Sequence, residues 1–142
     1  MYYIKTSAAF DSAHFLKGYN GKCANIHGHH WVVEVKLAGD SLTDEGAKRG
    51  MLIDFGDIKH ELRALARSFD HALIYEEGSL METTIKALSS ENFRLIPVPF
   101  RPTAENFARH FYELLSDKKL PVKSVKVFET PENCAEYEGG EL

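Results

Sequence analysis

The chain has 142 residues, a length typical of one domain, and its 44% hydrophobic and 27% charged residues indicate a globular protein and exclude a disordered one. The formal net charge of −4, from 17 basic and 21 acidic side chains, provides no positive field for nonspecific capture of nucleic acid or an anionic membrane. Two cysteines are too few for a disulfide framework, no apolar run approaches the roughly 20 residues that span a bilayer, and the N-terminus lacks a signal-peptide pattern. We therefore expect one domain, residues 1–142, in the reducing cytoplasm, without a nucleic-acid or membrane partner.

The first forty residues predict two strands that pair as a hairpin. In residues 2–14, every second side chain belongs to a loosely apolar face, and a loop rich in Gly and Asn follows at residues 17–22. In residues 27–37, the odd-numbered positions are histidine or apolar, whereas Glu34 and Lys36 lie on the opposite side. This alternation is typical of a half-buried strand in an antiparallel sheet.

Two amphipathic helices are predicted after a polar, Gly-containing loop at residues 40–50. The first helix begins at Asp54, a favourable N-cap, and its apolar stripe has helical spacing. The second helix has Thr103 as its N-cap and ends before Pro121. The stripes consist of Ile58, Leu62, Leu65, Ala66 and Phe69 in the first helix, and of Phe107, Phe111, Leu114 and Leu115 in the second.

Shorter segments complete the predicted fold. Residues 80–88 have a short helical pattern, and two prolines restrict residues 93–100 to an edge strand or an extended linker. Residues 124–130 predict a strand, and residues 134–137 predict a short fourth strand. Without an alternating βαβ pattern, this order predicts an α+β fold in which two helices cover one face of a four-stranded antiparallel sheet.

Three histidines are candidates for a metal site. His27 and His29 are two residues apart on a predicted strand, so both imidazoles lie on one face with Cβ atoms roughly 6–7 Å apart. Hairpin pairing brings His14 alongside, whereas His30 faces away by the same alternation. Three neutral imidazoles with one open position are the typical donor set of a catalytic zinc site. The alternative is a turn with two exposed histidines and no metal.

Cys23, four residues before His27, has three interpretations. It is a fourth zinc ligand, an inert small residue, or a base or nucleophile held beside the metal, where positive charge favours the thiolate. Cys134 has no such neighbours, and we expect it to be inert.

Asp70 and His71 follow the first predicted helix. A hydrogen bond between them would orient the imidazole and stabilise its protonated form, which suits a proton donor or acceptor near neutral pH. Adjacent residues on a strand point apart, so this pairing requires a turn or a helix end. The alternative is a histidine that only interacts with the C-terminal end of the helix dipole.

Glu129 shares its strand face with the apolar Val125 and Val127, so its carboxylate is predicted at the mouth of a buried face. Such a group is costly unless it is paired or bound to a ligand, and a planar heterocycle with two N–H donors suits it. Alternatively, the strand end simply enters solvent. Glu105, in the first turn of the second helix, is accounted for by the helix dipole.

Six segments occur in order over nearly the whole chain: Phe10-Asp11-Ser12-Ala13-His14, Cys23-Ala24-Asn25-Ile26-His27-Gly28-His29, Gly50-Met51-Leu52-Ile53-Asp54-Phe55, Asp70-His71-Ala72-Leu73, Pro102-Thr103-Ala104-Glu105-Asn106, and Glu129-Thr130 with Tyr137. Each is weak alone, but the ordered set is highly specific. Together they resemble the 6-pyruvoyl-tetrahydropterin synthase superfamily, and more narrowly its 6-carboxy-tetrahydropterin synthase branch, which acts in queuosine (7-deazaguanine) biosynthesis.

The resemblance implies a tunnelling fold, in which the sheets of several subunits join into a β-barrel and two trimers stack as a homohexamer, with the active site between subunits. It also implies roles for individual residues: the zinc ligands His14, His27 and His29, the catalytic thiol Cys23, the proton relay Asp70 and His71, the pterin anchor Glu129, and the pocket-rim residues Thr103 and Glu105.

The spacing Cys-x3-His-Gly-His resembles the carboxy branch, since the pyruvoyl branch typically has a longer gap, and the absence of glutamate at residues 24–26 argues against variants that resemble a folate-pathway bypass enzyme. The resemblance therefore implies zinc-dependent conversion of 7,8-dihydroneopterin triphosphate to 6-carboxy-tetrahydropterin, acetaldehyde and triphosphate. One alternative is 6-pyruvoyl-tetrahydropterin synthase, which eliminates triphosphate without C–C cleavage. Another is a noncatalytic, zinc-stabilised oligomeric binding module. Residues 76–100 are longer than in compact members, so we expect them to alter the pocket's lid or the oligomer contacts.

Overall fold

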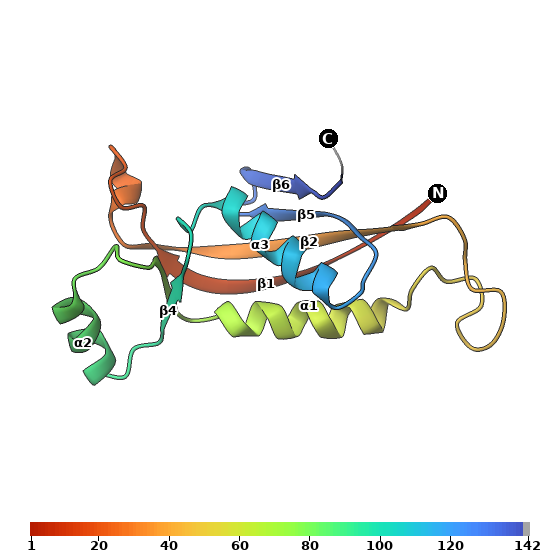
Figure 1. Cartoon of the computed structure of the whole chain (residues 1–142), viewed down its shortest axis with the longest axis horizontal. Helices are drawn as coiled ribbons and strands as arrows, with labels where there is room; N and C mark the ends of the chain where they lie inside the picture. The colour runs from red at the N-terminus through yellow and green to blue at the C-terminus, as the bar shows by residue number, and fades with distance from the viewer. Residues whose placement is uncertain (141–142) are drawn as a thin grey trace.

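The structure is a computed structural model that describes residues 1–140. Within these residues, one sheet of six strands carries three α-helices and a short 3₁₀ helix (Figure 1). In chain order the elements are β1 (Tyr2–His14), η1 (Lys22–Ala24), β2 (His27–Gly39), α1 (Phe55–Phe69), β3 (Leu73–Glu76), α2 (Glu82–Ser90), β4 (Leu95–Val98), α3 (Ala104–Asp117), β5 (Val122–Phe128) and β6 (Cys134–Glu138).

The predicted hairpin is confirmed, and it forms the centre of the sheet. β1 and β2 pair antiparallel in an unbroken register that runs from Tyr2 opposite Gly39 to His14 opposite His27. β5 pairs antiparallel with β2, and β6 pairs antiparallel with β5. These four strands are the antiparallel set that the sequence predicts.

The prediction of a purely antiparallel, four-stranded sheet with two helices is wrong in one region. The strand order is β4-β3-β1-β2-β5-β6, and both β1–β3 and β3–β4 pair in parallel. β3, α2 and β4 therefore form a βαβ unit, which the sequence did not indicate. The reason is length: β3 has only four residues, and a run this short has no readable period. Of the two alternatives predicted from the prolines of residues 93–100, the edge strand is confirmed, because β4 lies at one edge of the sheet.

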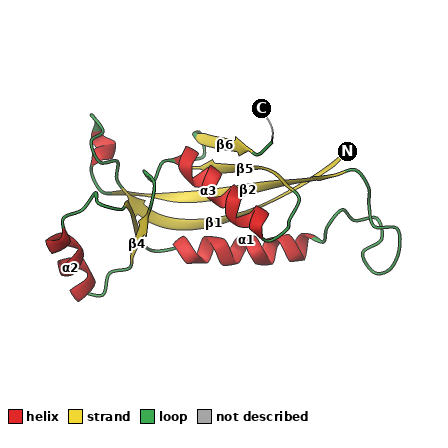
Figure 2. Cartoon of the chain, viewed as in Figure 1, coloured by secondary structure: helices red, strands yellow, loops and turns green. Residues whose placement is uncertain are grey.

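α1 and α3 pack on the same face of the sheet and bury their apolar stripes there (Figure 2). Both predicted N-caps are confirmed: Asp54 Oδ1 accepts the Gly56 N–H at 2.8 Å, and Thr103 Oγ1 accepts the Asn106 N–H at 3.3 Å. The core lies between helices and sheet and includes Phe10, Trp31, Phe107 and Phe111, each at most 1% exposed.

The opposite face of the hairpin is polar. Lys5 and Glu34 lie 3.6 Å apart there, as an ion pair between β1 and β2. On the same face, His30 Nδ1 lies 2.7 Å from Asp11 Oδ1, which confirms that His30 faces away from the other two histidines of its strand. Among the helices of residues 1–140, none is long and apolar enough to cross a membrane.

Candidate metal centre

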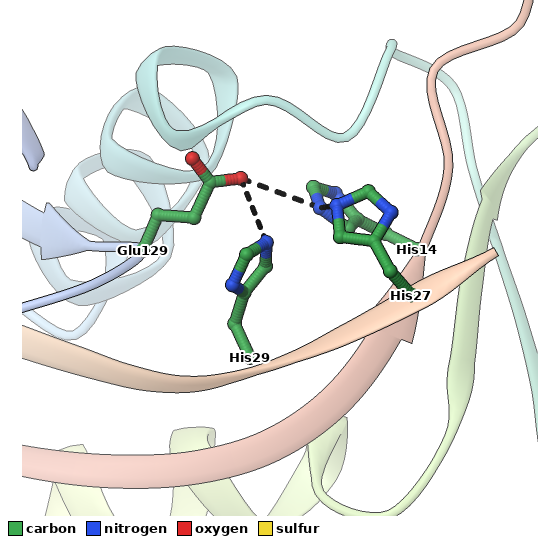
Figure 3. A group of neighbouring side chains, drawn as sticks. All are labelled: His14, His27, His29 and Glu129. Atoms are coloured by element: carbon green, nitrogen blue, oxygen red, sulfur yellow. Dashed lines mark hydrogen bonds and ion pairs between the residues drawn. The ribbon is translucent and has the colours of Figure 1, made fainter. Parts of the chain in front are cut away.

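Three histidine side chains converge where the β1–β2 hairpin ends (Figure 3). His14 is the last residue of β1 and pairs with His27, the first residue of β2, while His29 follows on the same face. The Nε2 atoms of His14 and His27 are 3.0 Å apart. The ring centroids of the three imidazoles lie between 4.5 and 5.1 Å from one another. The predicted convergence is confirmed.

A carboxylate joins this group. Glu129 directly follows β5, and its backbone N–H donates to the Asn133 carbonyl at 3.0 Å across a turn. Its Oε1 lies 3.3 Å from His14 Nε2 and 3.2 Å from His29 Nε2. One donor atom from each of the three histidines and Glu129 lies within 4.8 Å of the others. These four residues, which we call the metal group, can hold a metal ion.

Backbone carbonyls determine which nitrogen carries the proton in two of the rings. His14 Nδ1 lies 2.7 Å from the Pro102 carbonyl, and His27 Nδ1 lies 2.7 Å from the Asn25 carbonyl. Because a carbonyl oxygen only accepts, both Nδ1 atoms donate, and the Nε2 atoms of the neutral rings keep their lone pairs. Two lone pairs cannot form a hydrogen bond with each other, but one cation can satisfy both. Such a carbonyl bond behind the ring is typical of metal-ligating histidines.

Burial favours the neutral form of two imidazoles of the metal group, those of His14 and His29. His14 is 1% exposed, and burial lowers its pKa to about 4. Burial also lowers the pKa of His29, against the opposing effect of the Glu129 carboxylate. The buried Nε2 of His29 has no hydrogen-bond partner among the described residues, although Glu129 lies at ion-pair distance. Neutral imidazoles with free lone pairs are the form that binds a divalent metal.

Trp31 supports the metal group from the core. Its ring centroid lies 4.9 Å from that of His14 and 5.2 Å from that of His29, with the rings nearly perpendicular. Its Nε1–H donates to the Ser12 carbonyl at 3.2 Å, which fixes the indole against β1. Two of the imidazoles therefore rest on a rigid, fully buried side chain.

A cavity of about 330 Å³ opens beside the metal group. Thr103 and Glu105, at the N-terminus of α3, line it together with His14 and Glu129. The structure therefore brings the two predicted pocket-rim residues to the same cavity as the predicted pterin anchor. Arg101 and Tyr19 also line this cavity, and the guanidinium of Arg101 lies over the Tyr19 ring at 6.0 Å.

Cys23 is separate from the metal group. It lies half-buried in η1 as a free thiol, and its carbonyl accepts the Leu16 N–H at 2.9 Å. Within residues 1–140, its sulfur is not among the donor atoms of the metal group. The structure does not support the interpretation as a fourth metal ligand. The other two interpretations, a base beside the metal and an inert residue, stay open.

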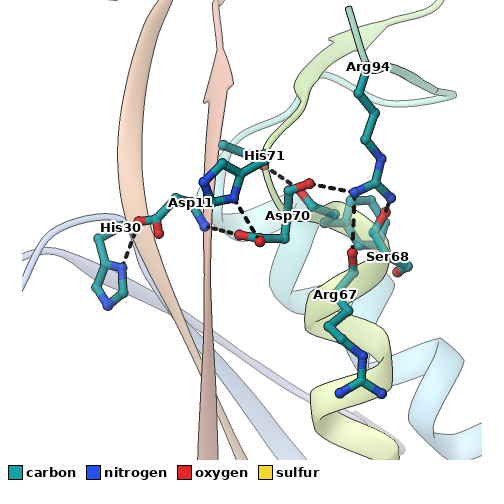
Figure 4. A network of polar contacts seen from close by, with 9 residues as sticks. Asp11, His30, Arg67, Ser68, Asp70, His71 and Arg94 are labelled. Carbon is teal, nitrogen blue, oxygen red and sulfur yellow. Dashed lines mark hydrogen bonds and ion pairs between the residues drawn. The ribbon is translucent and has the colours of Figure 1, made fainter.

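Asp70 and His71 form a hydrogen-bonded pair, with His71 Nδ1 2.7 Å from Asp70 Oδ2 (Figure 4). His71 has a left-handed φ of 51°, which turns its ring back toward the preceding carboxylate. This is the turn conformation that the predicted pairing requires. Hydrogen bonds, chiefly from the Asp11 N–H and then from His71, lower the pKa of the Asp70 carboxyl.

Within one chain, this pair does not line the cavity beside Glu129. His71 borders a different, larger cavity of about 650 Å³, whose walls include His30 and Arg94. His29 is the member of the metal group that borders this second cavity. The structure thus gathers the predicted metal ligands and pocket residues at one site and places the predicted proton relay at another.

Two features of these sites were missed by the sequence analysis. The first is the closeness of Glu129 to the imidazoles, for which its shared face with Val125 and Val127, both fully buried, was a usable signal. The second is the contact of Arg94 with the residues around Asp70, which joins segments 24 positions apart and leaves no local trace in the sequence.

Comparison with known proteins gives a consistent result. Residues 3–140 match the family model described as 6-pyruvoyl tetrahydropterin synthase. The chain is 39% identical to the 6-carboxy-5,6,7,8-tetrahydropterin synthase of Haemophilus influenzae, over 97% of this chain and 99% of that protein. It is 37% identical to the protein of the same name from Rickettsia bellii, over 88% of this chain and 91% of that protein.

Solved structures share the fold at lower identity. An uncharacterized protein from Wolinella succinogenes superposes with a TM-score of 0.79 at 22% identity and 98% coverage of both chains. The 6-pyruvoyl tetrahydropterin synthase of Plasmodium falciparum superposes with a TM-score of 0.70 at 19% identity, over 96% of this chain and 98% of that one.

Proposed function

The chain belongs to the 6-pyruvoyl tetrahydropterin synthase family, and from this premise we propose that it is a zinc-dependent 6-carboxy-5,6,7,8-tetrahydropterin synthase. Its substrates are 7,8-dihydroneopterin triphosphate and water, and its products are 6-carboxy-tetrahydropterin, acetaldehyde and triphosphate. The observation that carries the proposal is the metal group of three imidazoles and Glu129, which lies beside a cavity that is also lined by Thr103 and Glu105. Two relatives named for this activity align with 97% and 88% of the chain.

Zinc fits the donor set. Zn²⁺ favours imidazole nitrogen, and catalytic zinc sites use three protein ligands and leave one position open. In this proposal His14, His27 and His29 would supply the three nitrogens, and Glu129, the fourth member of the metal group, would bind the substrate and not the metal. The carbonyls of Pro102 and Asn25 would orient two of the rings. When bound, zinc supplies Lewis acidity that favours deprotonation of the hydroxyl groups on the substrate side chain.

In this proposal, Cys23 and His71 transfer the protons of the reaction. The Cys23 thiolate takes a proton from the substrate side chain, and triphosphate then leaves. His71, oriented by its 2.7 Å hydrogen bond to Asp70, shuttles protons during the tautomerisation that follows. The His71 side chain is 78% exposed, a position that suits contact with a substrate bound to another copy of the chain. In the last stage, a water molecule adds to the side-chain carbonyl next to the ring and the neighbouring C–C bond breaks, so that the water oxygen enters the carboxylate, the released carbon takes a proton, and acetaldehyde leaves.

Glu129 anchors the pterin ring. Its carboxylate accepts two N–H groups from the edge of the heterocycle, and bidentate pairing of this kind fixes orientation as well as position. Thr103 and Glu105 form the rim of the same cavity. Holding the ring in this way brings the reacting carbon toward Cys23. Lys17 and Lys22 are the candidates for contacts with the triphosphate.

The active site is completed between subunits of a homohexamer, a dimer of trimers built around a β-barrel. In support, β1 pairs with β3 only at Ala13 and Leu73, so most of its outer edge has no partner strand within residues 1–140. β6 is the edge strand at the far side of the sheet. Unpaired edges are ready sites for strand pairing with another copy. The Asp70–His71 pair of one subunit would then reach the metal group of another.

The proposed place of the reaction is queuosine biosynthesis in the cytoplasm. The nearest alternative is 6-pyruvoyl-tetrahydropterin synthase, the activity for which the family and the Plasmodium falciparum protein of the same fold are named. A noncatalytic, zinc-stabilised assembly module is the alternative from another class. Chelation distinguishes it, because removal of a purely structural metal dissociates or unfolds the protein.

Product analysis tests the proposal. Zinc-loaded protein is incubated with 7,8-dihydroneopterin triphosphate, acetaldehyde is trapped, and the pterins are identified by mass spectrometry. We expect 6-carboxy-tetrahydropterin and acetaldehyde in equal amounts. A pyruvoyl product without acetaldehyde would assign the sister activity and keep the site. No turnover at full zinc occupancy would contradict the proposal.

A further inference from the structure

Arg94 lies directly before β4, and its guanidinium binds the C-terminal end of α1 (Figure 4). Nη1 donates to the carbonyls of Asp70 and Arg67, the latter at 3.3 Å, and Nη2 donates to the Ser68 carbonyl at 2.7 Å. The last turn of an α-helix leaves carbonyl groups without helical partners. One rigid fork of donors therefore binds three carbonyls around the helix end, of which that of Arg67 also accepts the Asp70 N–H at 3.3 Å.

The main chain of Asp11 holds the same segment from the side of β1. The Asp11 N–H donates to Asp70 Oδ1 at 2.8 Å, and the Asp11 carbonyl accepts the His71 N–H at 2.6 Å. The Asp70 carboxylate is thus fixed at one oxygen by β1 and at the other by His71 Nδ1. The carbonyl of Asp70 has Arg94 as its bonding partner.

The direction of the His71 ring depends on this arrangement. Its φ of 51° is a conformation that residues with a Cβ rarely adopt, and it persists only where the surroundings enforce it. The peptide plane between Asp70 and His71 is held at its carbonyl by Arg94 and at its N–H by Asp11. Without Arg94, the Asp11 carbonyl still holds the N–H of this peptide plane, but the Asp70 carbonyl loses its bonding partner and can tilt toward water.

The backbone of Arg94 is itself anchored. Its carbonyl accepts the Leu73 N–H at 3.0 Å, and the β3–β4 pairing begins at the next residue, where Leu95 faces Leu73. The backbone of Arg94 is therefore held next to β3 at the start of β4, and from this position its exposed side chain extends to the end of α1.

We infer that Arg94 is a positioning residue of the Asp70–His71 proton relay, because it clamps the carbonyls that set the direction of the His71 ring. The inference rests on the proposed function, in which His71 transfers protons. Arg94 also contributes to the low pKa of the Asp70 carboxyl, but only as the smallest of several causes. The inference rests on the hydrogen bonds of the guanidinium to three backbone carbonyls, not on its charge.

The test compares Arg94→Met, which removes donors and charge, with Arg94→Lys, which keeps the charge but cannot span three carbonyls. Arg49→Met is the matched control, because Arg49 is exposed in the loop after β2. Each variant is also made in the His71→Gln background. The measurements are kcat and KM for acetaldehyde release, zinc content and melting temperature.

We expect Arg94→Met to lower kcat on the order of tenfold to a hundredfold, as displacements of about 1 Å do. KM and zinc content stay within about twofold of the wild-type values, Arg94→Lys is also impaired, and Arg49→Met is unchanged. In the His71→Gln background, Arg94→Met causes no further loss of kcat. If Arg94 only stabilised the fold, it would lower kcat equally in both backgrounds.

Three results would overturn the inference: wild-type kcat in Arg94→Met, full activity in Arg94→Lys, or an equal loss of kcat with and without His71. If Arg94→Met does not fold, Arg94→Lys and its His71→Gln double variant decide the question. Wild-type turnover in His71→Gln alone would instead contradict the proposed relay. Failure of the proposed function is thus distinguishable from failure of the Arg94 inference.

Discussion

Replacement of His29 by alanine removes one of the three imidazoles and leaves the fold intact, since the side chain lies at the hairpin end outside the main hydrophobic core. Loss of a group that only hydrogen-bonds to a metal ligand already lowers the metal affinity by about 10–100-fold. Loss of the ligand itself is therefore expected to cost more than about 100-fold. Substitution of His30, one residue away but on the opposite face and paired with Asp11, is the matched control.

The effect on stability follows from mass action. With free Zn²⁺ at about 100 times the wild-type Kd, binding stabilises the folded protein by about 2.7 kcal/mol. A variant that binds 100-fold more weakly is half occupied at that concentration and gains only about 0.4 kcal/mol. His29→Ala should therefore lose at least about 2.3 kcal/mol of zinc-dependent stabilisation.

Urea unfolding with and without zinc, together with metal analysis of the dialysed protein, measures this effect. Without zinc, the wild type, His29→Ala and His30→Ala should have similar midpoints. Addition of zinc should raise the midpoint of the wild type and of His30→Ala only. Equal stabilisation of all three proteins, or loss of zinc from His30→Ala, would refute the assignment of the metal group.

Three further predictions address the remaining residues. Cys23→Ala should lower kcat on the order of 10²–10⁴-fold while zinc stays bound; loss of zinc in that variant, seen by metal analysis, would make Cys23 a ligand. Glu129→Gln should raise KM for the pterin by at least about tenfold with zinc retained, because an amide offers only one acceptor oxygen; an unchanged KM in steady-state kinetics would remove Glu129 from the pterin contact. Burial lowers the pKa of His110, whose ring centroid lies 5.1 Å from that of Phe100. The neutral form of His110 therefore stabilises the folded protein above about pH 6.5, and this stability is lost as the pH falls toward the lower folded-state pKa. In His110→Gln, urea unfolding at pH 7 and pH 5.5 should show a smaller decrease than in the wild type, and an equal decrease would assign the pH effect to other groups.

The sequence predicted those parts of the fold that depend on interactions between residues close together in the chain. Alternation at period two placed the hairpin and the shared face of His27 and His29, because successive side chains of a strand must point to opposite faces. Asp54 and Thr103 located the starts of α1 and α3, because a free helix N-terminus needs an acceptor.

What the sequence did not show depends on contacts between distant segments. The parallel partners of β3 lie on β1 and β4, and nothing within its four residues specifies them. Arg94 binds carbonyls that lie 24 to 27 positions earlier in the chain. His110 lies within a predicted helix, but its half-buried position beside Phe69 and Phe100 arises because α3 meets the end of α1 and the segment after β4 there.

Zinc titration into the metal-free protein tests the central claim most directly, because it measures catalysis and folding together. The chelated protein should keep its circular dichroism spectrum and release no acetaldehyde from 7,8-dihydroneopterin triphosphate. Added zinc should restore acetaldehyde release in proportion to occupancy, up to one ion per chain. Turnover that is indifferent to zinc, or a chelated protein that unfolds before any zinc is added back, would contradict a catalytic metal held by His14, His27 and His29.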